Sequence, residues 1–288
     1  MTNNKPYLKI RDSFFIWGER TYLMGVLNVT PDSFSDGGEF NTPAAALAQA
    51  QRLVDAGADI IDIGGQSTRP GAQLVSEAEE LQRVLPVVEA VRSSLNVPIS
   101  VDTNRASVAE KAVAAGADVV NDISGGTFDP DMLPVVAQLH VPIILMHMRG
   151  TPQTMQQLTD YQDLIGEIYQ FLEGQIVAAL AVGIERSHLI IDPGIGFAKT
   201  FEQNLSILRQ LPIFHSLDVP LLIGVSRKSF IGHILNQPNP KNRVWGTAAA
   251  CCSAIAAGAE LLRVHDVLEM RDVSLVADAI WRKSDNND

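Results

Sequence analysis

The stretch VDAGADIIDIGG at residues 54–65 decides the fold, because the chain repeats its pattern twice. The second copy is VAAGADVVNDIS at 113–124, and the third is IAAGAELLRVHD at 255–266. In each copy, a helical segment ends at a glycine and a short aliphatic run follows at once. Glycine suits the left-handed residue that follows a helix. The pattern therefore predicts a recurring connection from a helix to a buried strand.

Further aliphatic runs extend this pattern along the chain. They are VPISVD at 97–102, VPIILMH at 141–147, VPLLIGVS at 219–226, YLMGVLN at 22–28 and HLIIDPG at 188–194. Proline placed ahead of a run precedes the hydrogen-bonded ladder and does not break it. Together with the three repeats, these runs predict about eight buried strands of the parallel type.

Amphipathic segments such as 42–57 and 76–95 lie between the predicted strands and are typical of helices. Strands that alternate with helices predict parallel βαβ units, and eight such units predict a closed (β/α)8 TIM barrel. A doubly wound open sheet is the alternative. We expect one domain over residues 1–288, with an N-terminal β-hairpin at 1–20 that caps the barrel, an enlarged helical excursion at 151–187 and a polar tail at 284–288.

Composition excludes several classes of function. Of the 288 residues 46% are hydrophobic, 6% are aromatic, and the net charge is −11, which argues against nucleic acid as a partner. The N-terminus lacks the apolar core of a signal peptide, and no run approaches the roughly 20 apolar residues that span a bilayer. Adjacent Cys251 and Cys252 suit neither a disulfide bond nor a metal site. We expect a cytoplasmic protein that binds no membrane.

Polar residues recur where the aliphatic runs end. They are Asn28, Thr68, Arg69, Asp102, Asn121, His147, Asp192, Lys228, Arg263 and His265. In an α/β barrel, chemistry collects at the carboxyl ends of the strands. Two of the loops there are long, NVTPDSFSDGGEF at 28–40 and GGQSTRPGA at 64–72, and we interpret them as lids or clamps. The positions of these polar residues therefore predict one site, to which segments from the whole length of the chain contribute.

Eight ordered motifs make the sequence resemble the dihydropteroate synthase family. They are MGVLNVTPDSFSDGG, DIGGQSTRPGA, VDT, VNDISGG, MHMRGTPQTMQ, IIDPGIGF, GVSRKSFIG and LRVHDV, and the resemblance covers residues 22–267. Two positions depart from the family pattern. Gln66 stands where the family commonly has Glu, and Ala198 stands where it has Gly. Gln66 removes a charge beside the second loop, which affects how that loop is positioned.

The resemblance implies a transferase of folate biosynthesis. Its expected substrates are 6-hydroxymethyl-7,8-dihydropterin pyrophosphate and p-aminobenzoate, and its products are 7,8-dihydropteroate and pyrophosphate. The resemblance further implies Mg2+ as cofactor, a homodimer and a sulfonamide target. Two alternatives are a pterin-binding methyltransferase, which passes a methyl group from methyltetrahydrofolate to a corrinoid, and a non-catalytic pterin-binding paralogue.

The resemblance also divides the candidate residues among three subsites. For the pterin they are Asp102, Asn121, Asp192, Lys228 and Arg263; for pyrophosphate Asn28, Arg263 and His265; for p-aminobenzoate Thr68, Arg69, Lys228 and Ser229. Met146 and Phe197 are further candidates for lining the pterin site, with ordinary packing as the alternative. Asn28 is the expected metal ligand. In the first loop, Asp36, with Phe34, is expected to close over the reacting carbon. The role of His147 stays open between a wall of the site and a structural partner.

Overall fold

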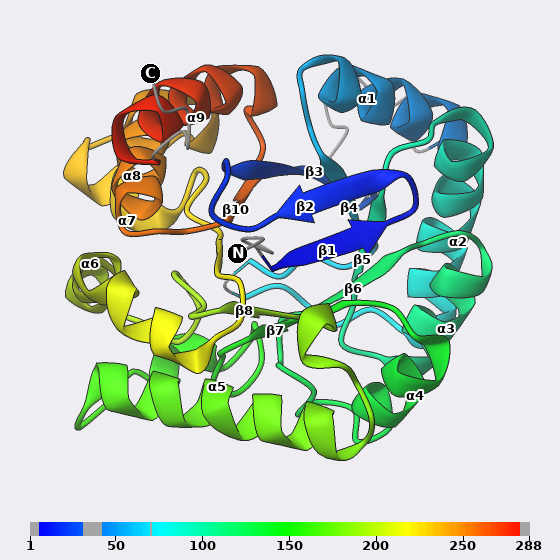
Figure 1. The fold of residues 1–288 in the computed structure, drawn as a ribbon, viewed down its shortest axis with the longest axis horizontal. Helices are drawn as coiled ribbons and strands as arrows, with labels where there is room; N and C mark the ends of the chain where they lie inside the picture. The colour runs from blue at the N-terminus through cyan, green and yellow to red at the C-terminus, as the bar shows by residue number, and fades with distance from the viewer. Residues whose placement is uncertain (1–5, 31–41, 70, 283–288) are drawn as a thin grey trace, which may run out of the picture.

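The computed structural model describes residues 6–30, 42–69 and 71–282 (Figure 1). Within these ranges eight parallel strands form one sheet, in the order β8-β7-β6-β5-β4-β3-β10-β9. They are β3 (Tyr22–Asn28), β4 (Ile60–Gly64), β5 (Ile99–Asp102), β6 (Val119–Asp122), β7 (Ile143–Met146), β8 (Leu189–Asp192), β9 (Leu222–Ile223) and β10 (Leu261–Val264). A parallel bridge between Ile191 and Leu221 joins the β8 edge to the β9 edge. The sheet is thus a nearly closed barrel, which confirms the predicted (β/α)8 fold and makes the open-sheet alternative wrong.

Helices surround the barrel on the outside (Figure 1). They are α1 (Pro43–Asp55), α2 (Glu77–Ser94), α3 (Ala106–Ala114), α4 (Met132–Leu139), α5 (Leu164–Ala181), α6 (Phe201–Gln210), α7 (Ser229–Ile234), α8 (Val244–Ala256) and α9 (Val267–Trp281). The 3-10 helices are η2 (Met155–Gln157), η3 (Arg186–His188), η4 (Leu211–Leu217) and η5 (Pro240–Asn242). Side-chain caps start several helices: Thr42 accepts from the N–H of Ala45, and Ser76 accepts from that of Glu79. The main core lies between this ring and the sheet.

The three repeated glycines adopt the backbone that the repeat predicts. Gly57, Gly116 and Gly258 have φ of 105°, 117° and 95°, a conformation that favours glycine. Each of them ends a helix and leads directly into β4, β6 or β10. The expected excursion between β7 and β8 is also present and consists of η2, α5 and η3.

An antiparallel hairpin covers the amino end of the barrel. It pairs β1 (Tyr7–Ile10) with β2 (Ser13–Ile16) and crosses the barrel in Figure 1 as the dark blue arrows. Leu8, Ile10 and Phe15 from this hairpin pack in one cluster with Tyr22 and Met24 of β3. The predicted hairpin cap is therefore confirmed.

The barrel interior changes from apolar to polar along the strands. Successive inward side chains of one strand lie two residues apart. In four strands, an inward apolar residue is followed two positions later by an inward polar residue. These pairs are Ile60 and Asp62, Val119 and Asn121, Ile190 and Asp192, and Leu261 and Arg263. The apolar members pack in the cluster beneath the hairpin, and the polar members face the carboxyl end. Strand periodicity thus places the candidate residues in one layer.

Candidate active site

Arg263 lies at the centre of the polar layer, where it bonds to two other strands directly and is linked to a third through Asp62. Its Nε donates to Asp62 Oδ2 at 2.6 Å, and its Nη2 donates to Asp102 Oδ2 at 2.8 Å. Asn121 Nδ2 donates to the same Asp62 oxygen at 3.2 Å. Asp62, Asp102 and Asn121 are buried. The structure therefore brings β4, β5, β6 and β10 together around one guanidinium.

Two glycines show how close the remaining candidates lie. A Cβ atom at Gly224 would be 3.8 Å from Asp192 Oδ2 and 3.9 Å from Arg263 Cβ. A Cβ atom at Gly64 would be 3.6 Å from both Asn28 Oδ1 and Asp102 Oδ2. Asp192 and Asn28 therefore border the same polar layer, from opposite sides of Arg263.

The carboxylates of this layer have raised pKa values. Burial raises the pKa of Asp102 to about 7, although the Arg263 charge opposes the shift. Burial also raises the pKa of Asp192, against the hydrogen bond that its Oδ1 accepts from Gly194 N at 2.7 Å. Buried carboxylates without full charge compensation bind a proton more readily. The site is thus poised to gain from a ligand that donates hydrogen bonds.

The basic groups are shifted in different directions. Burial lowers the pKa of Lys228 to about 8, partly offset by the charge of Asp192. Burial would lower the pKa of Arg263 as well, but Asp62 and Asp102 outweigh it and the pKa is raised. Burial, then the charges of Arg263 and Arg227, lower the pKa of His265 to about 3. His265 is therefore a neutral hydrogen-bonding group near pH 7.

Ser226 holds His265 in place. Its hydroxyl oxygen accepts from the His265 backbone N–H at 3.1 Å and lies 3.0 Å from the ring Nδ1. When the Ser226 hydroxyl donates to Nδ1, the hydrogen of the neutral ring lies on Nε2. Neighbouring Asp266 pairs with Arg227. The described hydrogen-bond partner of the His265 ring is thus Ser226.

An apolar wall flanks the polar layer. Met146 and Phe197 are buried in a small cluster with Ile123, Met148 and Met155, apart from the main core. The Lys228 ammonium lies 4.1 Å from the centroid of the Phe197 ring, a cation–π contact. A flat aromatic ligand suits an apolar wall with polar groups at its edge.

The candidates for the second substrate lie on loops at the same end of the barrel. Thr68 is half-buried and Arg69 is exposed, on the loop between β4 and α2. Ser229 is exposed and begins α7, directly after Lys228. The second loop is tied to the segment after β7, because Gly71 N donates to Pro152 O at 2.9 Å. Phe34 and Asp36 lie outside the described residues.

His147 is part of a buried structural network. Lys199 Nζ lies 3.0 Å from His147 Nδ1 and donates to Phe197 O at 2.8 Å. The His147 backbone N–H donates to Asp192 O at 2.9 Å, and its ring meets Phe171 edge-on. Burial and the charge of Lys199 lower the pKa of His147 to about 2. These contacts favour the structural role for His147 over a place in the wall of the site.

Sequence reasoning missed Asp62 and Lys199. Asp62 is a charged residue in the middle of the buried run IIDIG, and it holds Arg263. Lys199 follows the IIDPGIGF motif and is buried, which lowers its pKa well below the ordinary value. A charge inside an aliphatic strand could have revealed Asp62. Nothing in the sequence marks Lys199 as buried, because its partner His147 is 52 residues away.

Metal-binding and membrane-spanning features are absent from the described part of the chain. No group of three or more His, Cys, Asp or Glu residues there could hold a metal ion. Among the same residues, no helix is both long enough and apolar enough to span a membrane.

The comparisons with known proteins agree with this geometry. The sequence profile of the family described as pterin binding enzyme matches residues 24–265. The dihydropteroate synthase of Synechocystis is 61% identical over 96% of each chain. The structure of Xanthomonas albilineans dihydropteroate synthase with 4-aminobenzoic acid is 43% identical, with a TM-score of 0.91 over 98% of this chain and 100% of that one. The Yersinia pestis enzyme with a sulfonamide drug is 44% identical, with a TM-score of 0.90 over 95% and 98%.

The barrel and its polar layer define a pterin-binding enzyme. Within that class, the chain belongs to the dihydropteroate synthase family, and it is a transferase of folate biosynthesis.

Proposed function

We propose that the carboxyl end of the barrel binds dihydropterin pyrophosphate and p-aminobenzoate and joins them through the residues described above. The observation that carries this proposal is the convergence of Asp102, Asn121, Asp192 and Lys228 beside Arg263, next to an apolar wall. Purified protein with Mg2+ and both substrates should release pyrophosphate and form dihydropteroate. Absence of both products from folded protein would contradict the proposal.

The pterin edge suits the acidic side of the pocket. Adjacent N–H donors on the pterin can give two parallel hydrogen bonds to Asp192, as a guanidinium gives to a carboxylate. Asp102 and Asn121 would meet the remaining ring nitrogens, and Asn121 can donate as well as accept. Lys228, held over Phe197, would donate to the ring carbonyl. Lys228→Ala should weaken pterin binding, and unchanged affinity in calorimetry would refute this role.

Arg263, His265 and Asn28 would hold the pyrophosphate. Arg263 lies on β10, and His265 directly follows the end of that strand. The neutral His265 would donate from Nε2, and the guanidinium carries the charge. These fixed donors stabilise the negative charge that develops as the bond to the leaving oxygen breaks.

Asn28 is the residue that suits Mg2+. Its neutral Oδ1 borders the polar layer beside Asp102 Oδ2, and Mg2+ commonly keeps water and phosphate oxygens as its other ligands. One amide oxygen cannot hold the ion alone, so we propose that it binds together with the substrate. When bound, Mg2+ would neutralise charge on the departing pyrophosphate.

The arylamine would approach from the loops. Its amine is neutral at pH 7 and needs no strong base. Thr68, Arg69, Lys228 and Ser229 would position its carboxylate and ring. Loss of pyrophosphate leaves positive charge that the dihydropterin ring delocalises; the amine then forms the C–N bond and releases a proton. We expect no covalent enzyme intermediate, and Asp36 would help the first loop exclude water.

The site residues also argue against the two alternative functions. A corrinoid-dependent methyltransferase could share Asp102, Asn121 and Asp192, but Arg69, Lys228 and the long second loop favour the synthase reaction. A non-catalytic paralogue would have no need of the pyrophosphate residues Arg263 and His265. The product assay separates all three functions, because the synthase alone releases pyrophosphate.

We propose a homodimer formed through the C-terminal helices. One face of α9 exposes Leu268, Leu275, Val276 and Ile280, and Trp245 is exposed at the start of α8, which packs against α9. Contiguous exposed apolar side chains are typical of protein interfaces. Light scattering should give twice the chain mass, and a Leu275→Glu/Ile280→Glu variant should be monomeric.

We also propose that the protein is cytoplasmic and that sulfonamides inhibit it. The free thiols of Cys251 and Cys252 suit the reducing cytoplasm. Residues 1–288 would form a single domain, with a polar tail at 284–288 that lies outside the described residues. A sulfonamide, which mimics the arylamine, should compete with p-aminobenzoate in the product assay and leave the KM for the pterin substrate unchanged.

A further inference from the structure

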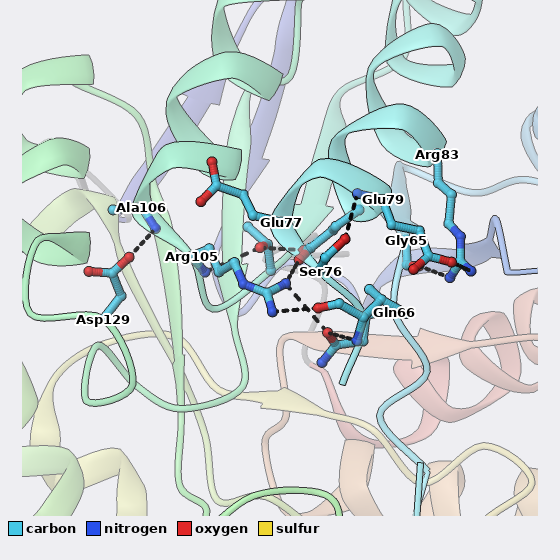
Figure 2. Close-up of polar contacts among 12 residues, drawn as sticks. Gly65, Gln66, Ser76, Glu77, Glu79, Arg83, Arg105, Ala106 and Asp129 are labelled. Atoms are coloured by element: carbon cyan, nitrogen blue, oxygen red, sulfur yellow. Dashed lines mark hydrogen bonds and ion pairs between the residues drawn. The ribbon is translucent and has the colours of Figure 1, made fainter. Parts of the chain in front are cut away.

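One arginine outside the polar layer contacts both ends of the segment 66–75, which overlaps the second loop. Arg105 lies between β5 and α3, three residues after Asp102. Its Nη2 donates to Val75 O at 2.7 Å, and its Nη1 lies 3.5 Å from Gln66 Oε1 (Figure 2). Gln66 and Val75 bound the segment that carries Thr68 and Arg69, which we call the 66–75 loop. Because one guanidinium touches both boundaries, it fixes the distance between them.

Further contacts hold the base of this loop in the same place. Val75 N donates to Gln66 Oε1 at 3.4 Å, so the two ends also meet directly. Arg83 Nη1 donates to Gly65 O at 2.9 Å, just before the loop begins (Figure 2). A Cβ atom at Gly65 would lie 2.7 Å from Val84 Cγ2, so the chain here packs tightly on α2. The loop therefore leaves and rejoins a fixed base.

Arg105 is itself anchored. It forms an ion pair with Glu80, whose side chain is buried at the start of α2. Thr103 donates from its hydroxyl to Glu80 Oε1 at 2.6 Å and accepts from the Arg105 backbone N–H at 3.2 Å. A buried ion pair costs desolvation and is weak evidence for added stability. Its geometric effect is clear, since it locks the guanidinium between β5, α2 and the loop.

We propose that Arg105 is a positioning residue that holds the 66–75 loop in register for the arylamine substrate. The inference rests on the proposed function, in which Thr68 and Arg69 meet that substrate. Without the guanidinium, the ends of the loop would keep only the weak direct contact between Val75 N and Gln66 Oε1, and the loop would sample more conformations. Binding would then have to order it, at a cost in affinity. The pterin pocket would be spared, because Arg263 holds Asp102 independently.

The test is steady-state kinetics on an Arg105→Met/Glu80→Gln variant. The second change prevents an unpaired buried carboxylate and keeps an oxygen for Thr103. We expect the KM for p-aminobenzoate to rise about tenfold, while kcat and the KM for the pterin substrate stay within about twofold. Arg105→Lys keeps the charge beside Glu80 but loses the forked donors, so it should give a smaller rise in the same constant.

Arg92→Met/Asp118→Asn is a matched control. The Arg92 and Arg105 side chains are both 15% exposed, and each pairs with one carboxylate. Arg92 binds Gly116 O and Val97 O, at the opposite end of the barrel. We expect this control to leave both KM values unchanged. A rise in the arylamine KM equal to that of the Arg105 variant would mean that general destabilisation causes the effect.

Three results would overturn the proposal. They are an unchanged arylamine KM in folded Arg105→Met/Glu80→Gln protein, an equal rise in both KM values, and full activity in Arg105→Lys together with loss of pterin binding in the double variant. The Thr68→Val and Arg69→Met variants, measured alongside, show whether the positioning role of Arg105 or the assignment of the arylamine subsite is wrong. If they raise the arylamine KM and the Arg105 variants do not, only the positioning role is wrong. If they too leave it unchanged, the subsite assignment is wrong.

Discussion

At the amino end of the barrel, Asp118 has both carboxylate oxygens engaged, by Arg11 on one side and by Arg92 and the Ile99 backbone N–H on the other. At the carboxyl end, Asp62 shares one oxygen between Arg263 and Asn121, and no described residue bonds to its Oδ1. Buried polar groups are normally satisfied, and exceptions commonly mark functional sites. The hydrogen-bonding capacity of the buried carboxylate is therefore used fully at the amino end of the barrel and only in part at the carboxyl end.

The side chains that occupy the two ends of the barrel also differ. The hairpin places Phe15 and Trp17 against Tyr22 and closes the amino end with aromatic contacts. The carboxyl end has a polar layer and one apolar wall instead. We infer that the amino end supplies stability and the carboxyl end supplies ligand binding. Substitutions at matched positions can break or sharpen this comparison.

The largest effect is expected for Arg263→Met. It removes the partner of Asp62 and Asp102, so kcat/KM should fall at least about 100-fold, and the free energy of unfolding should drop by about 3–5 kcal/mol. Arg92→Met should also lose stability but retain kcat/KM within about twofold, because Asp118 keeps two other donors. Kinetics and urea denaturation measure both quantities. Comparable loss of activity in the two variants would contradict the division between the ends.

Phe15→Ala should act on stability alone. Phe15 is fully buried, with its ring 4.8 Å from the Tyr22 ring, and such truncations cost about 3–5 kcal/mol. We expect kcat to be retained at temperatures where the protein stays folded. Phe14→Ala, on the exposed side of the same strand, should change the free energy of unfolding by less than about 1 kcal/mol. A kcat that falls in folded Phe15→Ala protein would show that the hairpin shapes the site.

A smaller, pH-dependent effect is expected at Asp102. Because burial raises its pKa to about 7, lowering the pH through 7 protonates the Asp102 carboxylate in the free enzyme. The neutral carboxyl no longer pairs with Arg263 or accepts from the pterin as well. The KM for the pterin substrate should therefore rise about tenfold between pH 8 and pH 6. Asp102→Asn should flatten this rise, and an equally steep profile in that variant would assign the titration to another group.

The smallest effect is expected for Gln66→Glu. A charged acceptor should strengthen the long contact with Arg105, but the buried Glu80 carboxylate nearby opposes a second negative charge. We expect the KM for p-aminobenzoate to change by less than about threefold, in the same product assay. A larger increase would mean that the amide of Gln66 is required for the loop in this chain.

Much of the fold was predictable because its signals are local. The aliphatic runs, the glycines at 57, 116 and 258, and the prolines ahead of three strands depend on nearest neighbours along the chain. The positions of Asp102, Asn121, Asp192 and Arg263 followed from strand periodicity and the barrel rule. Their contacts did not, because the bonds of Arg263 span 201 and 161 residues.

The amino-acid sequence alone determined the barrel, its hairpin and the strand ends that carry the candidate residues, since period-two alternation and turn residues encode these features locally. The tertiary structure decided the rest. It lowered the pKa of His265, joined His147 to Lys199, paired Arg263 with Asp62 and set Arg105 across the 66–75 loop. The physical reason is that pKa values and hydrogen-bond partners depend on burial and on distances between remote segments, which exist only after the barrel closes.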